Sequence, residues 1–177
     1  MRLTISGLPG SGTTTVAELL SKELSLELIS AGAVFRQMAA EKKLPLEQFS
    51  EMAEANDDFD RVIDERQREE AMETENAIVE GRLSGFIVPD ADLKIWLKAP
   101  VEIRAKRITV RENIGYGEAL HAMKSRERSE YKRYKQYYGL NLDDLSIYDL
   151  VIESSRWHED DIVALILWAT EHVKGKC

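Results

Sequence analysis

The sequence predicts an α/β fold in which a doubly wound, five-stranded parallel sheet carries helices on both faces. Two observations support this prediction. Short apolar, strand-like runs alternate with segments of helical periodicity along the chain, and a glycine-rich turn joins the first strand to the first helix. In sheets of this kind, ligands bind beyond the carboxyl ends of the strands. The polar residues that follow each predicted strand are therefore candidates for a functional site.

The N-terminal stretch predicts a phosphate-binding loop (P-loop). A buried strand is expected at residues 3–5 and a helix at 13–24. Between them, Gly7-Leu-Pro-Gly-Ser-Gly12-Thr13-Thr14 matches the pattern G-x-x-x-x-G-K-[ST] at both glycines and at the final hydroxyl, but Thr13 replaces the lysine. Glycines let successive backbone N–H groups converge on an anion, and the helix N-terminus adds partial positive charge. The alternative is a plain glycine turn, which leaves three glycines followed by three threonines unexplained.

The first half of the chain continues with a second strand at residues 26–30 and a helix of apolar residues in helical spacing. Two further helices are expected, one at about 46–53 and one from 59 to about 75. Since these helices separate two strands, residues 36–76 should form a small helical insertion.

The middle of the chain contains two more strands. The third is expected at residues 77–80 and is followed by a glycine-containing loop at 83–92. Leucine and isoleucine then alternate with lysine and tryptophan over residues 93–98, which predicts a half-buried fourth strand.

The last third of the chain begins with a helix at residues 101–112, which Pro100 opens. Gly115 and Gly117 should interrupt the helical pattern, and a second helix should cover residues 118–138.

The chain should end with a fifth strand and a final helix. The strand is expected at residues 148–152 and the helix at 159–173, with Ile166, Ala169 and Val173 among its inward-facing residues.

Composition and charge limit the partners. The 177 residues carry 24 Lys/Arg and 32 Asp/Glu, a net charge of −8, which argues against a nucleic-acid polymer or an anionic membrane as a general partner. Residues 101–135 nevertheless hold 10 basic and 5 acidic residues, which indicates a local small anion. With one cysteine, Cys177, and no signal-like N-terminal segment, we expect a cytoplasmic protein. No pattern specifies an oligomeric state.

Four arginines are spaced to share helix faces. Arg107 and Arg111 are four residues apart, and Arg126 and Arg133 are seven apart, on either side of the segment with Gly115. Such an arrangement can close over a ligand as a lid and exclude water. Arginines also stabilise the negative charge that develops in phosphoryl transfer. The alternative is a solvated basic helix with salt bridges between neighbouring turns.

These predictions describe one P-loop domain over residues 1–177. It divides into a core (1–35, 77–106 and 139–177), the helical insertion (36–76) and a lid (107–138).

The chain resembles the nucleoside-monophosphate kinase family and, within it, the archaeal-type cytidylate kinases. The resemblance covers nearly the whole chain. It is carried by I-S-G-L-P-G-S-G-T-T-T at 5–15, L-I-S-A-G-A-V-F-R at 28–36, V-E-G-R-L-S-G at 79–85, D-A-D-L-K-I-W-L-K-A-P at 90–100, R-I-T-V-R at 107–111, and K-R-Y-K-Q-Y-Y-G with D-D-L-S-I-Y-D-L-V-I within 132–152.

The resemblance implies an activity: ATP and CMP or dCMP are converted, with Mg²⁺, to ADP and CDP or dCDP. It also implies roles for individual residues. ATP would be bound by Gly7, Leu8, Pro9, Gly10, Ser11, Gly12, Thr13, Thr14, Thr15 and Arg107. The insertion would bind the acceptor, and the residues holding CMP would be Ser30, Gly32, Arg36 and Arg82. Thr14 and Glu80 would hold the metal ion, and Arg111, Arg126 and Arg133 would be catalytic.

Two positions depart from the family pattern. Thr13 stands where the loop lysine is usual, so we expect the lid arginines to supply the missing positive charge. Leu83 follows Arg82 where many cytidylate kinases carry an aspartate, which leaves the residues that read the cytosine base unassigned. Two other readings stay open: a kinase of the same fold for AMP or dephospho-CoA, and a nucleotide-binding regulator without turnover.

Overall fold

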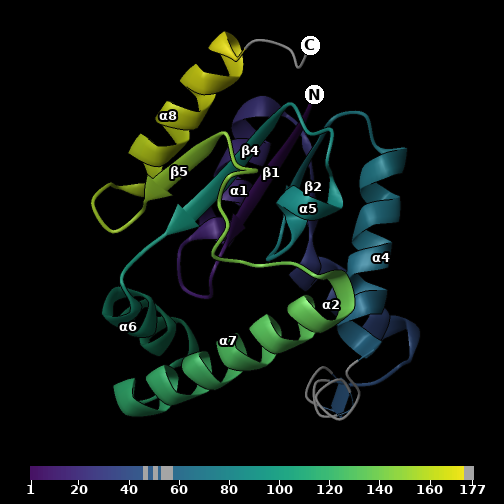
Figure 1. Cartoon of the computed structure of the whole chain (residues 1–177), viewed down its shortest axis with the longest axis vertical. Coiled ribbons are helices and arrows are strands. Elements are labelled where there is room, and N and C mark those ends of the chain that lie inside the picture. Colours follow the sequence, from purple (N-terminus) through teal and green to yellow (C-terminus); the bar gives the residue numbers. More distant parts are fainter. Residues whose placement is uncertain (46–47, 50–51, 53–57, 174–177) are drawn as a thin grey trace.

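The computed structural model describes residues 1–45, 48–49, 52 and 58–173. Its centre is a parallel sheet in the order β2-β3-β1-β4-β5, which confirms the predicted five-stranded parallel sheet (Figure 1). The strands are β1 (Arg2–Gly7), β2 (Glu27–Ser30), β3 (Ala77–Glu80), β4 (Leu93–Lys98) and β5 (Leu150–Glu153).

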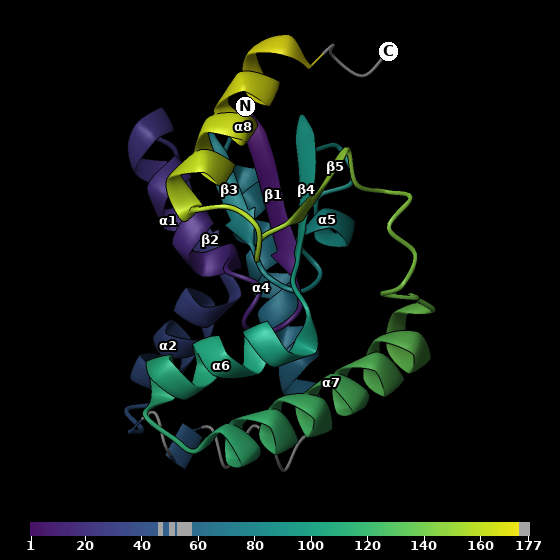
Figure 2. The same cartoon turned by 90° about the vertical axis from the view of Figure 1, so that its left-hand side faces the viewer.

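Helices cover both faces of the sheet and its carboxyl end. They are α1 (Thr13–Leu24), α2 (Ala31–Glu41), α4 (Asp58–Glu73), α5 (Ser84–Ile87), α6 (Val101–Glu112), α7 (Tyr116–Tyr138) and α8 (Glu159–His172). Figure 2 shows α1 and α8 on one face and α5 on the other, with α6 and α7 crossing beyond the carboxyl ends of the strands. No helix of the described residues is long and apolar enough to cross a membrane.

The largest apolar core lies between the sheet and the pair α1 and α8. It contains Leu3, Ile5 and Ile95 from the strands, packed against Leu20 of α1 and Ile166 of α8, all inaccessible to solvent. Burial of such side chains is the main stabilising contribution to a fold of this type. This core fixes β1 and α1 relative to each other and therefore fixes the ends of the loop between them.

The prediction that β4 is half-buried is wrong. Lys94 and Trp96 are both buried, although they alternate with the apolar residues of the strand. The reason is the position of β4 between β1 and β5, with protein on both faces. The ring of Trp96 lies 5.1 Å from that of Tyr148, which covers the second face. In a parallel sheet covered on both faces, alternation does not mark a solvent side.

The segment after β3 contains a short helix, α5, where the sequence predicts only a loop. Ser84 opens this helix, and its Oγ lies 2.7 Å from Ser6 Oγ, while the N–H of Gly85 donates to the same Ser6 Oγ. A Cβ at Gly85 would lie 2.6 Å from Tyr148, so only glycine fits against the ring. Tertiary contacts thus stabilise a helix that local pattern does not indicate.

Three smaller predictions need correction or lie outside the described residues. Gly117 does not interrupt a helix, because α7 begins at Tyr116 with Gly115 as N-cap, and Gly117 falls in its first turn. Val173 does not face inward but lies just after α8 and is exposed. The helix expected near 46–53 lies mostly outside the described residues, although Phe49 is described and packs between the rings of Phe35 and Phe59.

Gln67 ties α4 to the carboxyl ends of two strands. Its buried Nε2 donates to the carbonyl oxygens of Ile29, at 3.2 Å, and Glu80, at 2.6 Å. This residue therefore fixes α4 against the carboxyl ends of β2 and β3.

We predict that Gln67→Leu lowers the free energy of unfolding by about 1–3 kcal/mol, because two buried carbonyl oxygens lose their donor. Urea denaturation followed by circular dichroism measures this change. The matched control is Gln37→Leu on the exposed surface of α2, which should change stability by less than about 0.5 kcal/mol. Equal effects of the two substitutions would contradict the role given to Gln67.

Candidate active site

The loop between β1 and α1 has a backbone conformation that depends on its glycines. Gly10 and Gly12 have positive φ angles of 79° and 94°. A Cβ at Gly7 would lie 2.4 Å from Ser11 Oγ and 2.5 Å from the carbonyl oxygen of Leu97. Each glycine of the predicted motif therefore occupies a position where a side chain would strain the backbone or clash.

The carbonyl oxygens of the loop accept hydrogen bonds from side chains elsewhere in the chain. The four donor–acceptor pairs are Arg82 Nη1 to Gly7 O (2.8 Å), Arg104 Nη1 to Pro9 O (3.1 Å), Arg107 Nη1 to Gly10 O (3.2 Å) and Ser154 Oγ to Ser11 O (2.6 Å). Helix α1 then begins at Thr13, with Gly12 as N-cap and no capping bond from a side chain. The N–H groups of its first turn are thus available to an anion.

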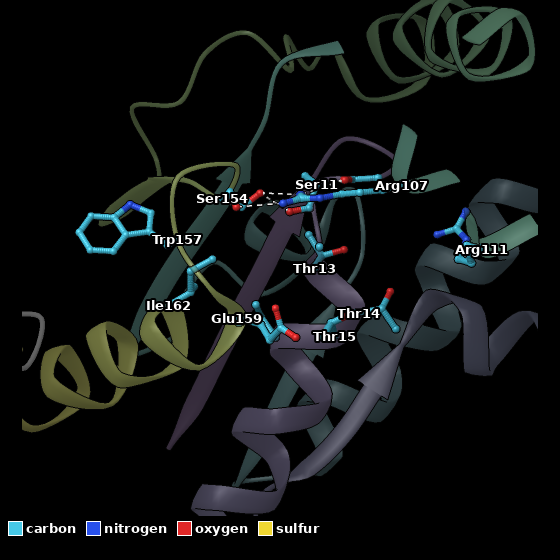
Figure 3. A pocket seen from close by; sticks show the side chains of 13 residues that line it. Ser11, Thr13, Thr14, Thr15, Arg107, Arg111, Ser154, Trp157, Glu159 and Ile162 are labelled. Carbon is cyan, nitrogen blue, oxygen red and sulfur yellow. Dashed lines mark hydrogen bonds between the residues drawn. The ribbon is translucent and has the colours of Figure 1, made fainter. Parts of the chain in front are cut away.

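A pocket of about 470 Å³ lies against this loop (Figure 3). Seven of the residues predicted to bind ATP line it, and they are Gly10, Ser11, Gly12, Thr13, Thr14, Thr15 and Arg107. Gly7, Leu8 and Pro9 are not among the lining residues. Figure 3 shows Trp157 and Ile162 at one end of the pocket and Arg111 at the other. The pocket therefore has an apolar end and a cationic end, with the threonines between them.

Arg107 connects the loop to the turn after β5. Its Nη1 donates to Gly10 O and, at 2.9 Å, to Ser154 Oγ, while its Nη2 donates to Ser154 O at 2.9 Å. A Cβ at Gly12 would lie 3.8 Å from Nη1, so the guanidinium stands over the start of α1. Three hydrogen bonds thus fix one cation beside the N–H groups of the loop.

Glu80 ends β3 directly beside the loop threonines. Its Oε1 accepts hydrogen bonds from Thr13 Oγ1 at 2.7 Å and from Thr14 Oγ1 at 3.3 Å. Burial raises the pKa of this carboxyl group, and the two hydroxyl donors oppose that rise. Mg²⁺ takes hard oxygen ligands and is usually held by one or two protein groups together with water and phosphate oxygens. The hydroxyl of Thr14 and the carboxylate of Glu80 fit such an ion.

The residues expected to hold an acceptor lie at the junction of β2 and α2. Ser30 caps α2, because its Oγ accepts the N–H of Ala33 at 3.0 Å. A Cβ at Gly32 would lie 3.5 Å from Arg36 Nη1, so the exposed Arg36 side chain folds back over Gly32. The structure thus brings Ser30, Gly32 and Arg36 together, at a place separate from the pocket of Figure 3. Arg82 lies elsewhere, bonded to Gly7 O.

The arginines of the predicted lid occupy different surroundings. Arg111 lines the pocket and forms an exposed ion pair with Glu112 at 2.6 Å. Arg126 pairs with Glu130 one turn along α7, and Arg133 donates to Ser129. In this arrangement Arg107 and Arg111 line the pocket, and Arg126 and Arg133 do not.

Several residues of the site carry no signal in the sequence. Glu130 is buried against Arg82, Glu127 pairs with Arg104, and Ser154 binds both Arg107 and the loop. In the sequence, acidic residues three apart on a charged helix are typical of a solvent-exposed face. Only the fold shows that these two contact arginines from other elements. For Ser154, the one available signal is its place just after a strand, at the carboxyl edge of the sheet.

This loop, in a doubly wound parallel sheet with arginines around it, defines a P-loop protein built to bind nucleotide phosphates. Comparison with known proteins identifies the family. Residues 2–156 match the model of the cytidylate kinase-like family, and the chain belongs to that family. It is 49% identical to the cytidylate kinase of Methanopyrus kandleri over 174 residues, covering 93% of this chain and 90% of that protein. The cytidylate kinase of Archaeoglobus fulgidus is 47% identical over 176 residues, covering 99% and 98%.

Solved structures support the same fold. The shikimate kinase of Bacteroides thetaiotaomicron superimposes with a TM-score of 0.65 over 97% of this chain and 98% of its own, at 15% identity. At that identity the likeness concerns the fold alone. The resemblance to archaeal cytidylate kinases is thus confirmed by the family match and the relatives, and the protein is a nucleoside-monophosphate kinase, a phosphotransferase.

We predict that Arg107→Ala raises the KM for ATP about 10-fold or more, because charge-assisted hydrogen bonds contribute about 1.5–3 kcal/mol each. The KM for the acceptor should change by less than about 3-fold, since Arg107 lies in the pocket of the loop. Steady-state kinetics with each substrate varied in turn measures both constants. Lys106→Ala, an exposed neighbour on α6, is the matched control and should leave both unchanged. An equal rise in the two constants would place Arg107 outside the ATP site.

Proposed function

We propose that the protein is a cytidylate kinase that transfers the γ-phosphoryl group of ATP to CMP and dCMP, forming ADP and CDP or dCDP. The observation that carries the proposal is the family match over residues 2–156, which contains the P-loop, the pocket arginines and the β2–α2 junction. The reaction would require Mg²⁺ and would belong to pyrimidine nucleotide metabolism in the cytoplasm. Its partners would be small molecules, without a nucleic-acid polymer or a membrane.

On the donor side, the loop from Gly7 to Thr15 would bind the ATP phosphates through its N–H groups. The apolar end of the pocket, with Trp157 and Ile162, would accept the adenine. Arg107 would lie between the adenine and the phosphates. Thr14 and Glu80 would hold Mg²⁺, which neutralises phosphate charge when bound.

On the acceptor side, the resemblance assigns CMP binding to Ser30, Gly32, Arg36 and Arg82, and the first three lie together, whereas Arg82 is bonded to Gly7 O and Glu130. Ser30 and Gly32 form the start of α2, where N–H groups and partial positive charge favour a phosphate. Arg36 stands over that helix start and adds a full positive charge. The phosphate of CMP would therefore bind at the N-terminus of α2, and an in-line transfer would require it to face the ATP phosphates at the N-terminus of α1.

During transfer, negative charge spreads over the moving phosphoryl group and its two flanking oxygens. Arg111, Arg126 and Arg133 would stabilise that charge, since they belong to the two helices that cross the carboxyl end of the sheet. The same helices would exclude water, which otherwise competes with CMP as acceptor. Thr13 adds no charge in this scheme, because its hydroxyl donates to Glu80.

The two other readings are less favoured. A kinase of the same fold for AMP or dephospho-CoA is not suggested by relatives that are named cytidylate kinases along nearly the whole chain. A regulator without turnover would not need the four arginines Arg107, Arg111, Arg126 and Arg133 of the proposed lid. In the assay below, the first alternative predicts that another acceptor is phosphorylated faster than CMP, and the second predicts no release of ADP.

We predict that CMP and dCMP are the best acceptors in a panel with UMP, AMP and GMP, at fixed ATP and Mg²⁺. ADP release coupled to NADH oxidation measures the rates. Chelating the metal with EDTA should abolish transfer, because Mg²⁺ neutralises the phosphates. A higher kcat/KM for AMP than for CMP would refute the substrate assignment, and no ADP release above background with any acceptor would refute the enzyme assignment.

We predict that Arg36→Ala raises the KM for CMP by roughly 10- to 150-fold, because a charge-assisted bond to phosphate contributes about 1.5–3 kcal/mol. The KM for ATP should change by less than about 3-fold, since Arg36 lies at the β2–α2 junction. Gln37→Ala, the exposed neighbouring residue, is the control. Equal effects on both substrates would show that Arg36 does not serve the acceptor.

A further inference from the structure

Glu130 of α7 is a buried carboxylate placed between two arginines. Its side chain is 4% exposed. Oε1 accepts hydrogen bonds from Arg126 Nε at 2.7 Å and from Arg82 Nη2 at 3.1 Å, and Oε2 lies 2.7 Å from Arg82 Nε. Burial alone would raise the pKa of Glu130, but the two guanidinium groups outweigh it and hold that pKa below the usual value. The group is therefore an ionised carboxylate inside the protein.

Arg82 connects this carboxylate to the phosphate loop. Its side chain is 13% exposed, and Nη1 donates to Gly7 O at 2.8 Å while Nε and Nη2 face Glu130. Because a guanidinium is planar, fixing one edge on the loop fixes the direction of the other edge. The contacts thus run from Gly7, through Arg82 and Glu130, to Arg126.

Arg126, at the far end of these contacts, is 67% exposed, so packing does not immobilise its guanidinium. The contact from Nε to Glu130 Oε1 is short, at 2.7 Å, and Arg82 holds the same carboxylate through its other oxygen. Apolar packing beside it supports the same docking, because Leu83, which follows Arg82, packs against Tyr134 one turn beyond Glu130. Helix α7 is therefore attached to the end of β3 by a charged and an apolar contact side by side.

We propose that Glu130 is a positioning residue for phosphoryl transfer: it orients Arg126 relative to the phosphate loop by binding Arg82 and Arg126 with one carboxylate. The inference rests on the proposed function, in which Arg126 stabilises the transferring group. Glu130 itself does not touch substrate in this scheme: it acts through Arg126, while Arg82 holds its carboxylate in place.

A second acidic residue of α7 provides an internal comparison. Glu127 pairs with buried Arg104, which donates to Pro9 O and Ala99 O. This contact also attaches α7 to the loop, but through Arg104 of α6 and not through Arg82. Loss of Glu127 should therefore weaken the packing of α7 against the loop, but it should leave the contact between Glu130 and Arg126 in place.

The decisive experiment is a double-mutant cycle with Glu130→Gln and Arg126→Ala, assayed for CMP phosphorylation. Alone, E130Q should lower kcat about 10- to 100-fold while the KM for ATP stays within about 3-fold, the signature of a group that acts in the transition state. In the Arg126→Ala background, the same substitution should lower kcat by less than about 3-fold, because the group through which it acts is gone. E127Q should be additive with Arg126→Ala. Glu130→Asp, which keeps the charge, should recover part of the lost kcat.

Hydrogen exchange provides a readout that needs no turnover. In the ligand-free protein, E130Q should increase amide exchange in α7 around residues 126–134 and in the loop at 7–12. Glu118→Gln, an exposed change on the same helix, should increase neither. Additive kinetic effects of E130Q and Arg126→Ala, or unchanged exchange in E130Q, would overturn the inference. A wild-type protein that phosphorylates no nucleoside monophosphate would instead refute the proposed function, and the exchange measurement would still test the coupling between α7 and the loop.

Discussion

The structure depends on how the carbonyl oxygens of the phosphate loop are satisfied. A loop that presents its N–H groups to an anion needs partners for the carbonyl oxygens of the same peptides. Here the oxygens of Gly7, Pro9 and Gly10 accept from Arg82, Arg104 and Arg107. These arginines come from the end of β3 and from α6, so the loop holds its conformation only when the sheet and the helices beyond it are in place. The need for these hydrogen bonds explains why arginines that are distant in sequence surround the loop.

Much of the fold follows from patterns in the sequence. The order of strands and helices is visible because apolar runs of four to six residues alternate with helical spacing, and the bounds of α1 and α6 agree with those expected from their flanking glycine and proline. What the sequence does not reveal depends on tertiary contacts. Helix α5 is supported by the Ser6–Ser84 contact, and Trp96 is covered by the ring of Tyr148 on the second face of the sheet. No local pattern carries either contact.

The candidate site was predictable in its backbone and less so in its side chains. A glycine motif between a strand and a helix specifies the loop, because few other conformations require glycines at those positions. Arginine spacing predicts helix faces but not the groups that face them. Glu127 and Glu130 lie three residues apart on one charged helix, yet they contact arginines 23 and 48 residues away in sequence. Only the packing of α7 across the carboxyl end of the sheet distinguishes these two from solvated glutamates.

The missing loop lysine changes the charge balance around the phosphates. Thr13 donates its hydroxyl to Glu80, so this position adds no cation and instead partly stabilises a buried carboxylate. Two of the three arginines on the loop are paired with carboxylates of α7, Arg82 with Glu130 and Arg104 with Glu127. Among the described residues, Arg107 donates to carbonyl and hydroxyl oxygens and forms no ion pair, so its positive charge remains beside the start of α1. Since charge interactions strengthen where water is excluded, a phosphate bound between Arg107 and the start of α1 would be attracted strongly, and we propose that this fixed arginine replaces the flexible lysine.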